Sequence, residues 1–237
     1  MKLKGKRAII TGSTKGIGLA IARALVGEGV SVVISSRNQK AIDRIVSQLG
    51  QASNQQVVGK QCDVSEADQC EILVNYCVEK LGGLDILVNN AGVGLFKKVE
   101  EMSVQEWRNI LSTNLDGVFF NCRFAIPEMK KSGEGFIVNI GSLAGKNAFP
   151  QGAAYNASKF GLTGFSEALM QEVRHDDIQV AHVMPGSVDT GFGNNKGSHS
   201  WKLSSEDVAR VVVETLSRDA RCLTSQIEMR PAKPPSK

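Results

Sequence analysis

The chain has 237 residues, of which 42% are hydrophobic and 22% charged, and 28 basic against 24 acidic residues give a net charge of +4. This composition is typical of a globular protein, and the length suits one large domain better than two small ones. The positive excess is small and scattered, which argues against nucleic acid or a membrane surface as a partner. No apolar run is long enough to span a bilayer.

Apolar runs of strand length alternate with segments of helical periodicity along the chain. The predicted strands are 7–11, 31–35, 56–62, 85–88, 135–140, 179–183 and 224–229. The predicted helices are 17 to about 27, 41–49, 66–81, one long helix from 104 toward Pro127, 154–173, and one reaching about 216 that is capped by 204–207. This alternation predicts an α/β fold with a doubly wound parallel sheet of about seven strands and helices on both faces.

No linker or internal repeat interrupts this alternation, so the sequence predicts a single dinucleotide-binding and catalytic domain over 1–230. The tail 231–237 is expected to be extended and poorly ordered. The polar segment 191–201 is expected to form a mobile lid or substrate loop.

The five cysteines form no C-x-x-C pair, and the three histidines show no metal-binding spacing. We therefore predict no metal site, and we interpret the cysteines as core or surface residues. No signal peptide precedes them, so a reduced, cytoplasmic protein is expected.

A glycine-rich turn, TGSTKGIG at 11–18, joins the first strand to the first helix. Glycines permit a tight turn and let backbone N–H groups approach a pyrophosphate at the positive end of a helix. The spacing G-x-x-x-G-x-G is neither a Walker loop nor the common G-x-G-x-x-G, and a plain strand–helix turn would use the same letters. Its place after the first strand favours dinucleotide binding. The predicted contacts are Gly12, Ser13, Thr14, Lys15, Gly16, Ile17 and Gly18.

The end of the second strand indicates which dinucleotide binds. Sites for NAD usually place an acid there to accept from the ribose 2′-hydroxyl, whereas this chain has Ser36 and Arg37, with no acid before Asp43. Arg37 can pair with a 2′-phosphate, Ser36 can donate a hydrogen bond, and Lys15 adds positive charge. Together they predict NADP(H).

Three further loops follow strands, at the edge where open α/β sheets bind ligands. Asp63 and Val64 are expected beside the adenine. Small residues in the loop after the fourth strand are expected to let the backbone pass close to a ribose, and the loop after the sixth strand is expected to meet the nicotinamide carboxamide. These two loops contribute Asn90, Ala91, Gly92, Pro185, Gly186, Val188 and Thr190.

Tyr155 and Lys159 stand four residues apart in 154–173, so a helix there projects both from one face. A phenol has an ordinary pKa near ~10, and a neighbouring ammonium favours the phenolate. A Y-x-x-x-K pair also occurs on exposed helices without any function. The pair alone leaves both interpretations open.

In their order, these motifs resemble those of the short-chain dehydrogenase/reductase family. The resemblance rests on TGSTKGIG at 11–18, DV at 63–64, NNAG at 89–92, Asn114, Ser142, YNASK at 155–159 and PGSVDT at 185–190. It covers nearly the whole chain and implies a Rossmann-type fold. It also implies reversible hydride transfer between the nicotinamide and a carbonyl or secondary alcohol.

The family pattern assigns the catalytic roles to Asn114, Ser142, Tyr155 and Lys159. The resemblance implies that Tyr155 is the general acid/base, and that Lys159 holds the nicotinamide ribose and lowers the pKa of the phenol. It further implies that Ser142 hydrogen-bonds the substrate oxygen and that Asn114 holds a water linking Lys159 to solvent. The chemistry needs such groups, because hydride arriving at a carbonyl carbon builds an alkoxide.

The substrate pocket is expected to draw on 94–96, 143–151 and 191–201, with Phe149 and Phe192 as candidate apolar walls. The front of the chain is similar to 3-oxoacyl-carrier-protein reductases. The ending 227–231 departs from their Gly-Gly-containing last strand and is more similar to reductases of small aldehydes and ketones. The leading prediction is therefore an NADPH-dependent carbonyl reductase, and the alternatives are 3-oxoacyl thioester reduction in fatty-acid synthesis and a non-catalytic NADP(H)-binding regulator or scaffold.

The helices predicted around 104–127 and 154–173 carry more apolar side chains than one face of a sheet requires. They include Phe119, Phe120, Phe124, Phe160, Phe165 and Leu169. Members of the family commonly pair these helices, so a homodimer or homotetramer is expected. Packing within one subunit is the alternative.

Overall fold

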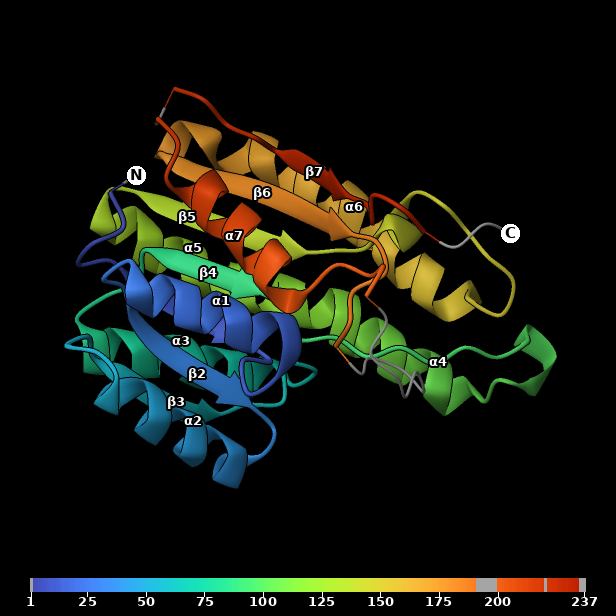
Figure 1. Cartoon of the computed structure of the whole chain (residues 1–237), viewed down its shortest axis with the longest axis horizontal. Helices are drawn as coiled ribbons and strands as arrows, with labels where there is room; N and C mark the ends of the chain where they lie inside the picture. Colours follow the sequence, from blue (N-terminus) through green and yellow to red (C-terminus); the bar gives the residue numbers. More distant parts are fainter. Residues whose placement is uncertain (1, 191–199, 220, 235–237) are drawn as a thin grey trace.

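The computed structural model describes residues 2–190, 200–219 and 221–234. A parallel sheet runs through the middle of the molecule in the order β3-β2-β1-β4-β5-β6-β7 (Figure 1), which confirms the predicted seven-stranded, doubly wound Rossmann-type architecture. The strands are β1 (Arg7–Thr11), β2 (Ser31–Ser36), β3 (Val57–Gln61), β4 (Ile86–Asn89), β5 (Gly135–Ile140), β6 (Ile178–Pro185) and β7 (Gln226–Met229).

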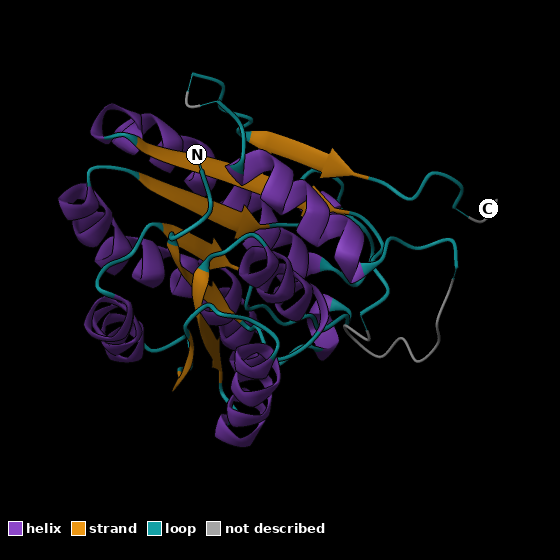
Figure 2. Ribbon diagram, turned by 60° about the vertical axis from the view of Figure 1, so that its left-hand side comes forward, coloured by secondary structure: helices purple, strands orange, loops and turns teal. Residues whose placement is uncertain are grey.

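Helices cover both faces of the sheet (Figure 2). On one face α1, α2 and α7 pack over one apolar cluster, and on the other α3, α5 and α6 pack over a second. The helices are α1 (Gly16–Gly27), α2 (Gln39–Gln51), α3 (Ala67–Leu81), α4 (Val104–Leu111), α5 (Gly117–Ser132), α6 (Ala153–Val173) and α7 (Ser205–Leu216). As predicted, Ser204 caps α7 in a reciprocal capping box with Asp207.

The central strands are largely apolar because both of their faces are covered. Every residue of β4 and β5 is buried. Successive side chains on a strand point to opposite faces, so Ile9 joins the core beneath α3 and α5 while Ile10 joins the core beneath α1 and α7.

The segment predicted as one helix from 104 toward Pro127 differs from that prediction in two ways. It divides into α4 and α5 around a π-helical turn, Ser112–Asp116. It also continues past Pro127 to end at Ser132, followed by the capping residue Gly133, whose φ is 79° and whose N–H donates to the carbonyl of Lys130 (3.2 Å). A proline removes one helical donor, and the burial of Met129 beyond it holds the last turn against the core.

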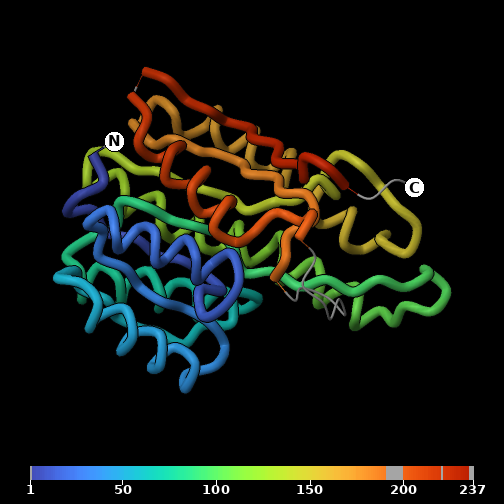
Figure 3. Tube along the Cα trace, viewed as in Figure 1, coloured from blue at the N-terminus to red at the C-terminus, as the bar shows by residue number. Residues whose placement is uncertain are grey.

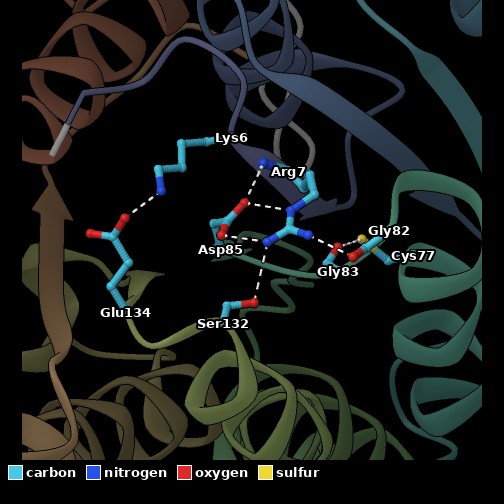
Figure 4. Close-up of polar contacts among 8 residues, drawn as sticks. All are labelled: Lys6, Arg7, Cys77, Gly82, Gly83, Asp85, Ser132 and Glu134. Atoms are coloured by element: carbon cyan, nitrogen blue, oxygen red, sulfur yellow. Dashed lines mark hydrogen bonds and ion pairs between the residues drawn. The ribbon is translucent and has the colours of Figure 1, made fainter.

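A polar cluster joins the amino ends of β1 and β4 (Figure 4). It lies at the edge of the sheet where the strands begin, opposite the edge that carries the loops after the strands. The guanidinium of Arg7 donates to both carboxylate oxygens of Asp85 (2.7 and 2.8 Å), to the carbonyl of Gly82 (2.6 Å) and to the hydroxyl of Ser132 (3.2 Å). A side chain on Gly83 would collide with this guanidinium, because an added Cβ would lie 2.1 Å from one of its nitrogens.

Figure 3 shows the amino terminus at the end of the molecule where the strands begin, and segments 93–103 and 143–152 at the opposite end. The predicted loop 191–201 falls almost entirely on residues outside the described ranges, as do Phe192 and the last three residues of the predicted tail 231–237. Among the described residues, no helix is long and apolar enough to cross a membrane.

Candidate functional site

A cavity of about 530 Å³ opens at the carboxyl ends of the strands. It straddles β1 and β4, where the chain changes its direction of winding across the sheet, and this is the position at which open α/β sheets bind ligands. Of the residues predicted from sequence, it brings together Gly12, Thr14, Lys15, Gly16, Ile17, Ser36, Arg37, Asp63, Val64, Asn90, Ala91, Gly92, Ser142, Tyr155, Lys159, Pro185, Gly186, Val188 and Thr190.

The path of the glycine turn depends on backbone conformations that favour glycine. Gly12 and Gly16 have φ values of +65° and +53°. An added Cβ on Gly12 would also lie 3.0 Å from the Cα of Ala91. The turn therefore passes close to the loop after β4 and forms the floor of the cavity.

The amino terminus of α1 faces the cavity without a capping side chain. Lys15 occupies the N-cap position but makes no side-chain cap hydrogen bond, and the first turn contains no acidic residue. The first N–H groups of a helix lack partners within the helix and carry its positive end. This end of α1 therefore fits a phosphate or pyrophosphate group.

Two residues of the turn, Ser13 and Gly18, do not line the cavity, although both were predicted as cofactor contacts. The hydroxyl of Ser13 is buried, donates to the carbonyl of Ile10 (2.7 Å) and accepts from the N–H of Ser35 (2.9 Å). A Cβ on Gly18 would lie 2.4 Å from the side-chain nitrogen of Asn90. Both residues therefore support the conformation of the turn on its side away from the cavity.

The end of β2 presents a cationic side chain to the cavity. Arg37 is 68% exposed at its side chain and lies 3.9 Å from the carboxylate of Asp63, which is a long ion pair. The other oxygen of Asp63 accepts from the N–H (3.1 Å) and hydroxyl (2.8 Å) of Ser65. The guanidinium of Arg37 is thus available to a second anion.

The loop after β4 is fastened to the glycine turn. The side-chain amide of Asn90 donates to the carbonyls of Thr11 (2.9 Å) and Gly12 (3.2 Å). The hydroxyl of Thr11 accepts from the N–H groups of Asn90 and Ala91, both at 3.0 Å. Asn90 therefore holds the shape of the cavity floor as well as lining it.

The phenol of Tyr155, near the start of α6, meets the hydroxyl of Ser142 just after β5. The two side chains are hydrogen-bonded, and Ser142 also accepts from the N–H of Ala144 (3.1 Å). Burial raises the pKa of Tyr155, and the hydrogen bond from Ser142 offsets only part of that rise. Burial thus leaves the pKa of Tyr155 above its ordinary value, and the lowering of that pKa by Lys159 stays a prediction.

Lys159 lies one turn further along α6 and is buried. Its ammonium donates to the carbonyl of Ile140 (3.1 Å) and lies 5.8 Å from the centre of the Tyr155 ring. Burial lowers the pKa of Lys159 to about 8, so the group is still mostly charged at neutral pH.

Asn114 lies in the π-helical turn and does not line the cavity. Its side-chain oxygen accepts from the N–H of Val93 (2.8 Å), and its amide donates to the carbonyl of Val93 (2.9 Å) and the hydroxyl of Ser158 (3.1 Å). Ser158 in turn donates to the carbonyl of Tyr155 (2.8 Å). Asn114 thus connects the loop after β4 with α6, and its predicted water contact stays a prediction.

Other residues at the site were not identified from the sequence. His182 on β6 occupies the space behind Gly141, where an added Cβ would lie 2.0 Å from its Nε2. Burial, followed by the charges of Lys159 and Lys146, lowers the pKa of His182 to about 4. No motif or spacing signals these positions. The additional cavity-lining residues are Cys62, Val93, Thr113, Ile140 and Gly141, whereas Gly94 lines the cavity as expected of the predicted segment 94–96.

The described part of the chain shows neither a disulfide nor a metal-binding group. Its five cysteines are free, and four of them are buried. No group of three or more His, Cys, Asp or Glu side chains within the described ranges could hold a metal ion.

Comparison with known proteins gives matches over nearly the whole chain. The family model for short chain dehydrogenase matches residues 6–201. Dehydrogenase/reductase SDR family member 4 of Oryctolagus cuniculus is 41% identical over 222 residues, which cover 93% of this chain and 84% of that protein.

Solved structures share the fold as well. An alcohol dehydrogenase from the archaeon Thermococcus sibiricus, complexed with 5-hydroxy-NADP, has a TM-score of 0.91 and 28% identity, covering 98% of this chain and 99% of that one. A short chain dehydrogenase/reductase from Burkholderia phymatum, in complex with NAD, has a TM-score of 0.88 and 25% identity over 100% of both chains.

The fold and the glycine turn at its switch point define an α/β protein of the nucleotide-binding Rossmann class. The match to the family model and the 41% identical relative are more specific. The chain belongs to the short-chain dehydrogenase/reductase family, a family of oxidoreductases.

Proposed function

We propose that this protein is an NADP(H)-dependent oxidoreductase that transfers a hydride between the nicotinamide and a carbonyl or secondary alcohol substrate. The observation that carries the proposal is the convergence of the Tyr155 phenol, the Ser142 hydroxyl and the Lys159 ammonium on one wall of the cavity. A non-catalytic regulator or scaffold would have no use for a buried acid/base beside a hydroxyl donor.

In the reducing direction, NADPH when bound would supply the hydride for the new C–H bond at the carbonyl carbon. Tyr155 donates its proton to the carbonyl oxygen as the double bond becomes single, and Ser142 donates a hydrogen bond to the same oxygen. The positive charge of Lys159 stabilises the phenolate that Tyr155 leaves behind. In the oxidising direction, Tyr155 takes the proton from the alcohol.

The residues at the cavity fit NADP(H) along its length. The uncapped end of α1 would hold the pyrophosphate, and Ser36 and Arg37 would hold the 2′-phosphate. Asp63 and Val64 would lie beside the adenine. The remaining contacts would come from Asn90, Ala91 and Gly92 at a ribose, Tyr155 and Lys159 at the nicotinamide ribose, and Pro185, Gly186, Val188 and Thr190 at the carboxamide.

We also propose a single cytoplasmic domain that assembles as a homodimer or homotetramer through α5 and α6. Phe119 on α5 and Phe160 on α6 are 45% and 46% exposed, which supports a contact between subunits. Phe120, Phe124, Phe165 and Leu169 instead pack against the core of their own subunit. The molar mass of the purified protein in solution tests the assembly.

The experiment that tests the function follows NADPH oxidation by the purified protein across aldehydes, ketones, diketones and 3-oxoacyl thioesters. We expect turnover with at least one class and formation of the matching alcohol. The thioester arm decides whether 3-oxoacyl-carrier-protein reduction, the runner-up, replaces the smaller carbonyls. Failure of every class to oxidise NADPH would contradict the proposal.

Replacing Arg37 by alanine is expected to raise the KM for NADPH about 10- to 100-fold and to change the KM for NADH far less. The reason is that a charge-assisted hydrogen bond contributes about 1.5–3 kcal/mol, and only NADPH carries the 2′-phosphate. Initial rates with both cofactors measure the effect. Arg44→Ala removes the same charge from an exposed position on α2 outside the cavity and serves as the control. Equal use of both cofactors by the unmodified protein would count against the cofactor assignment.

A further inference from the structure

Two phenylalanine rings near the reactive phenol remain partly exposed among the described residues. Phe96 comes from the segment between β4 and α4, and Phe149 from the segment between β5 and α6. Their ring centroids are 5.6 Å apart, and that of Phe96 lies 5.6 Å from the Tyr155 ring in an edge-on contact at 81°. Both phenylalanines are 41% exposed. We call Phe96 and Phe149 the aromatic wall.

The aromatic wall is held in place by the backbone around it. The N–H of Lys97 donates to the carbonyl of Gln151 (2.9 Å), which joins the two segments. The side-chain oxygen of Asn156 accepts from the N–H of Phe149 (3.3 Å). Gly152 lies directly against this ring, where an added Cβ would come within 2.5 Å of a ring carbon. The rings are therefore positioned before any substrate arrives.

The lysines around the aromatic wall are already paired. Each lysine of segments 93–101 and 143–151 has a carboxylate partner among the described residues. The three pairs are Lys97 with Glu106 (2.5 Å), Lys98 with Glu100 (3.8 Å) and Lys146 with Glu228 (2.7 Å). A thioester carrier brings phosphate groups or an acidic protein surface, which unpaired cations would recognise. These segments offer apolar ring surface instead.

We propose that the substrate is an uncharged carbonyl compound with an aryl substituent, whose ring packs on Phe96 and Phe149 while its carbonyl oxygen meets Tyr155 and Ser142. This inference rests on the proposed reductase function and specifies its substrate class. Aromatic pairs prefer tilted or edge-on contacts with centroids about 4.5–7 Å apart, and the wall already shows this geometry within the protein. The aryl ring of a substrate would add one more aromatic contact of this kind.

The test uses the protein with NADPH and two ketones that differ only in the aromaticity of a ring one carbon away from the carbonyl group. We expect kcat/KM for 1-phenylpropan-2-one to exceed that for 1-cyclohexylpropan-2-one about threefold to tenfold. In Phe149→Leu this preference falls below about twofold through a rise in the KM of the aryl ketone, and Phe149→Tyr, which keeps the ring, retains it. Equal kcat/KM values in the unmodified protein, or faster turnover of acetoacetyl-CoA, would overturn the inference.

A binding measurement separates this inference from the reductase proposal. Calorimetric titration of the Tyr155→Phe variant, saturated with NADP⁺, compares the two ketones without turnover. Tighter binding of the aryl ketone supports the aromatic wall even if the unmodified protein reduces neither compound, which would contradict only the reductase proposal. If the protein reduces both ketones and binds them with equal affinity, the reductase proposal is supported and the proposed role of the aromatic wall is contradicted.

Discussion

Replacing Tyr155 by phenylalanine is expected to lower kcat about 10²- to 10⁴-fold while raising the Kd for NADPH by no more than about tenfold, the effect of one lost hydrogen bond. A positioned general acid contributes a rate factor of this size, equivalent to about 3–5 kcal/mol of transition-state stabilisation. Phenylalanine keeps the ring that contacts Phe96 and removes only the hydroxyl. Steady-state turnover together with fluorescence titration of NADPH measures both quantities.

The chain supplies a matched control for this substitution. Its only other tyrosine, Tyr76, lies on α3 beside Lys60 and Lys80 and does not line the cavity. Tyr76→Phe should leave turnover unchanged. Unaltered turnover in Tyr155→Phe would remove Tyr155 from the mechanism, and a parallel loss in both variants would point to folding.

Replacing Asp85 by asparagine is expected to lower the free energy of unfolding by about 3 kcal/mol. The substitution preserves shape but removes the buried carboxylate that is the counter-charge of the partly exposed guanidinium of Arg7. Breaking a fully buried pair costs about 3–5 kcal/mol, and the lower end applies here because Arg7 still reaches solvent. Urea unfolding followed by circular dichroism measures the loss. Asp219→Asn breaks the exposed ion pair with Arg221 and should cause no measurable change.

The same pair predicts how stability depends on pH. Burial alone would raise the pKa of Asp85, but the hydrogen bonds and charge of Arg7 outweigh burial and leave that pKa below its ordinary value. A carboxyl group with a lowered folded-state pKa stabilises the fold fully above its unfolded pKa of about 3.9 and loses this contribution as the pH falls through the folded value. The stability difference between the unmodified protein and Asp85→Asn should therefore be constant above about pH 5 and shrink in acid. A difference that stays unchanged in acid would contradict this account.

Much of the fold could be predicted from the sequence because apolar runs and helix caps are both local signals. The apolar run of β5 and the Ser204 cap of α7 can be recognised within a few residues, and the structure contains both. The motifs also marked most of the residues that converge on the cavity. Local signals suffice here because all strands of a parallel sheet end at the same edge.

The remaining features depend on contacts between distant segments. Nothing in the letters around Ser13 shows that its hydroxyl is buried between β1 and β2. The 5.6 Å contact between Phe96 and Phe149 likewise joins positions 53 residues apart. Pro127 misled the helix prediction because a local rule stops a helix near proline, whereas packing of the following turn decided the outcome here.

The π-helical turn at Ser112–Asp116 limits how the length of this chain can vary. Such a turn holds one residue more than an α-helical turn, and each residue of an α-helix advances about 100° around its axis. Deleting one residue within this turn would leave an α-helical turn and preserve the rotation of α5 relative to α4. Deleting one residue early in Gly117–Ser132 would instead rotate the rest of α5 by that angle, and Met129, now buried against the sheet, would leave its place in the core. Natural changes of length between Ser103 and Gly133 should therefore be found in Ser112–Asp116 and not in the α-helical stretches on either side.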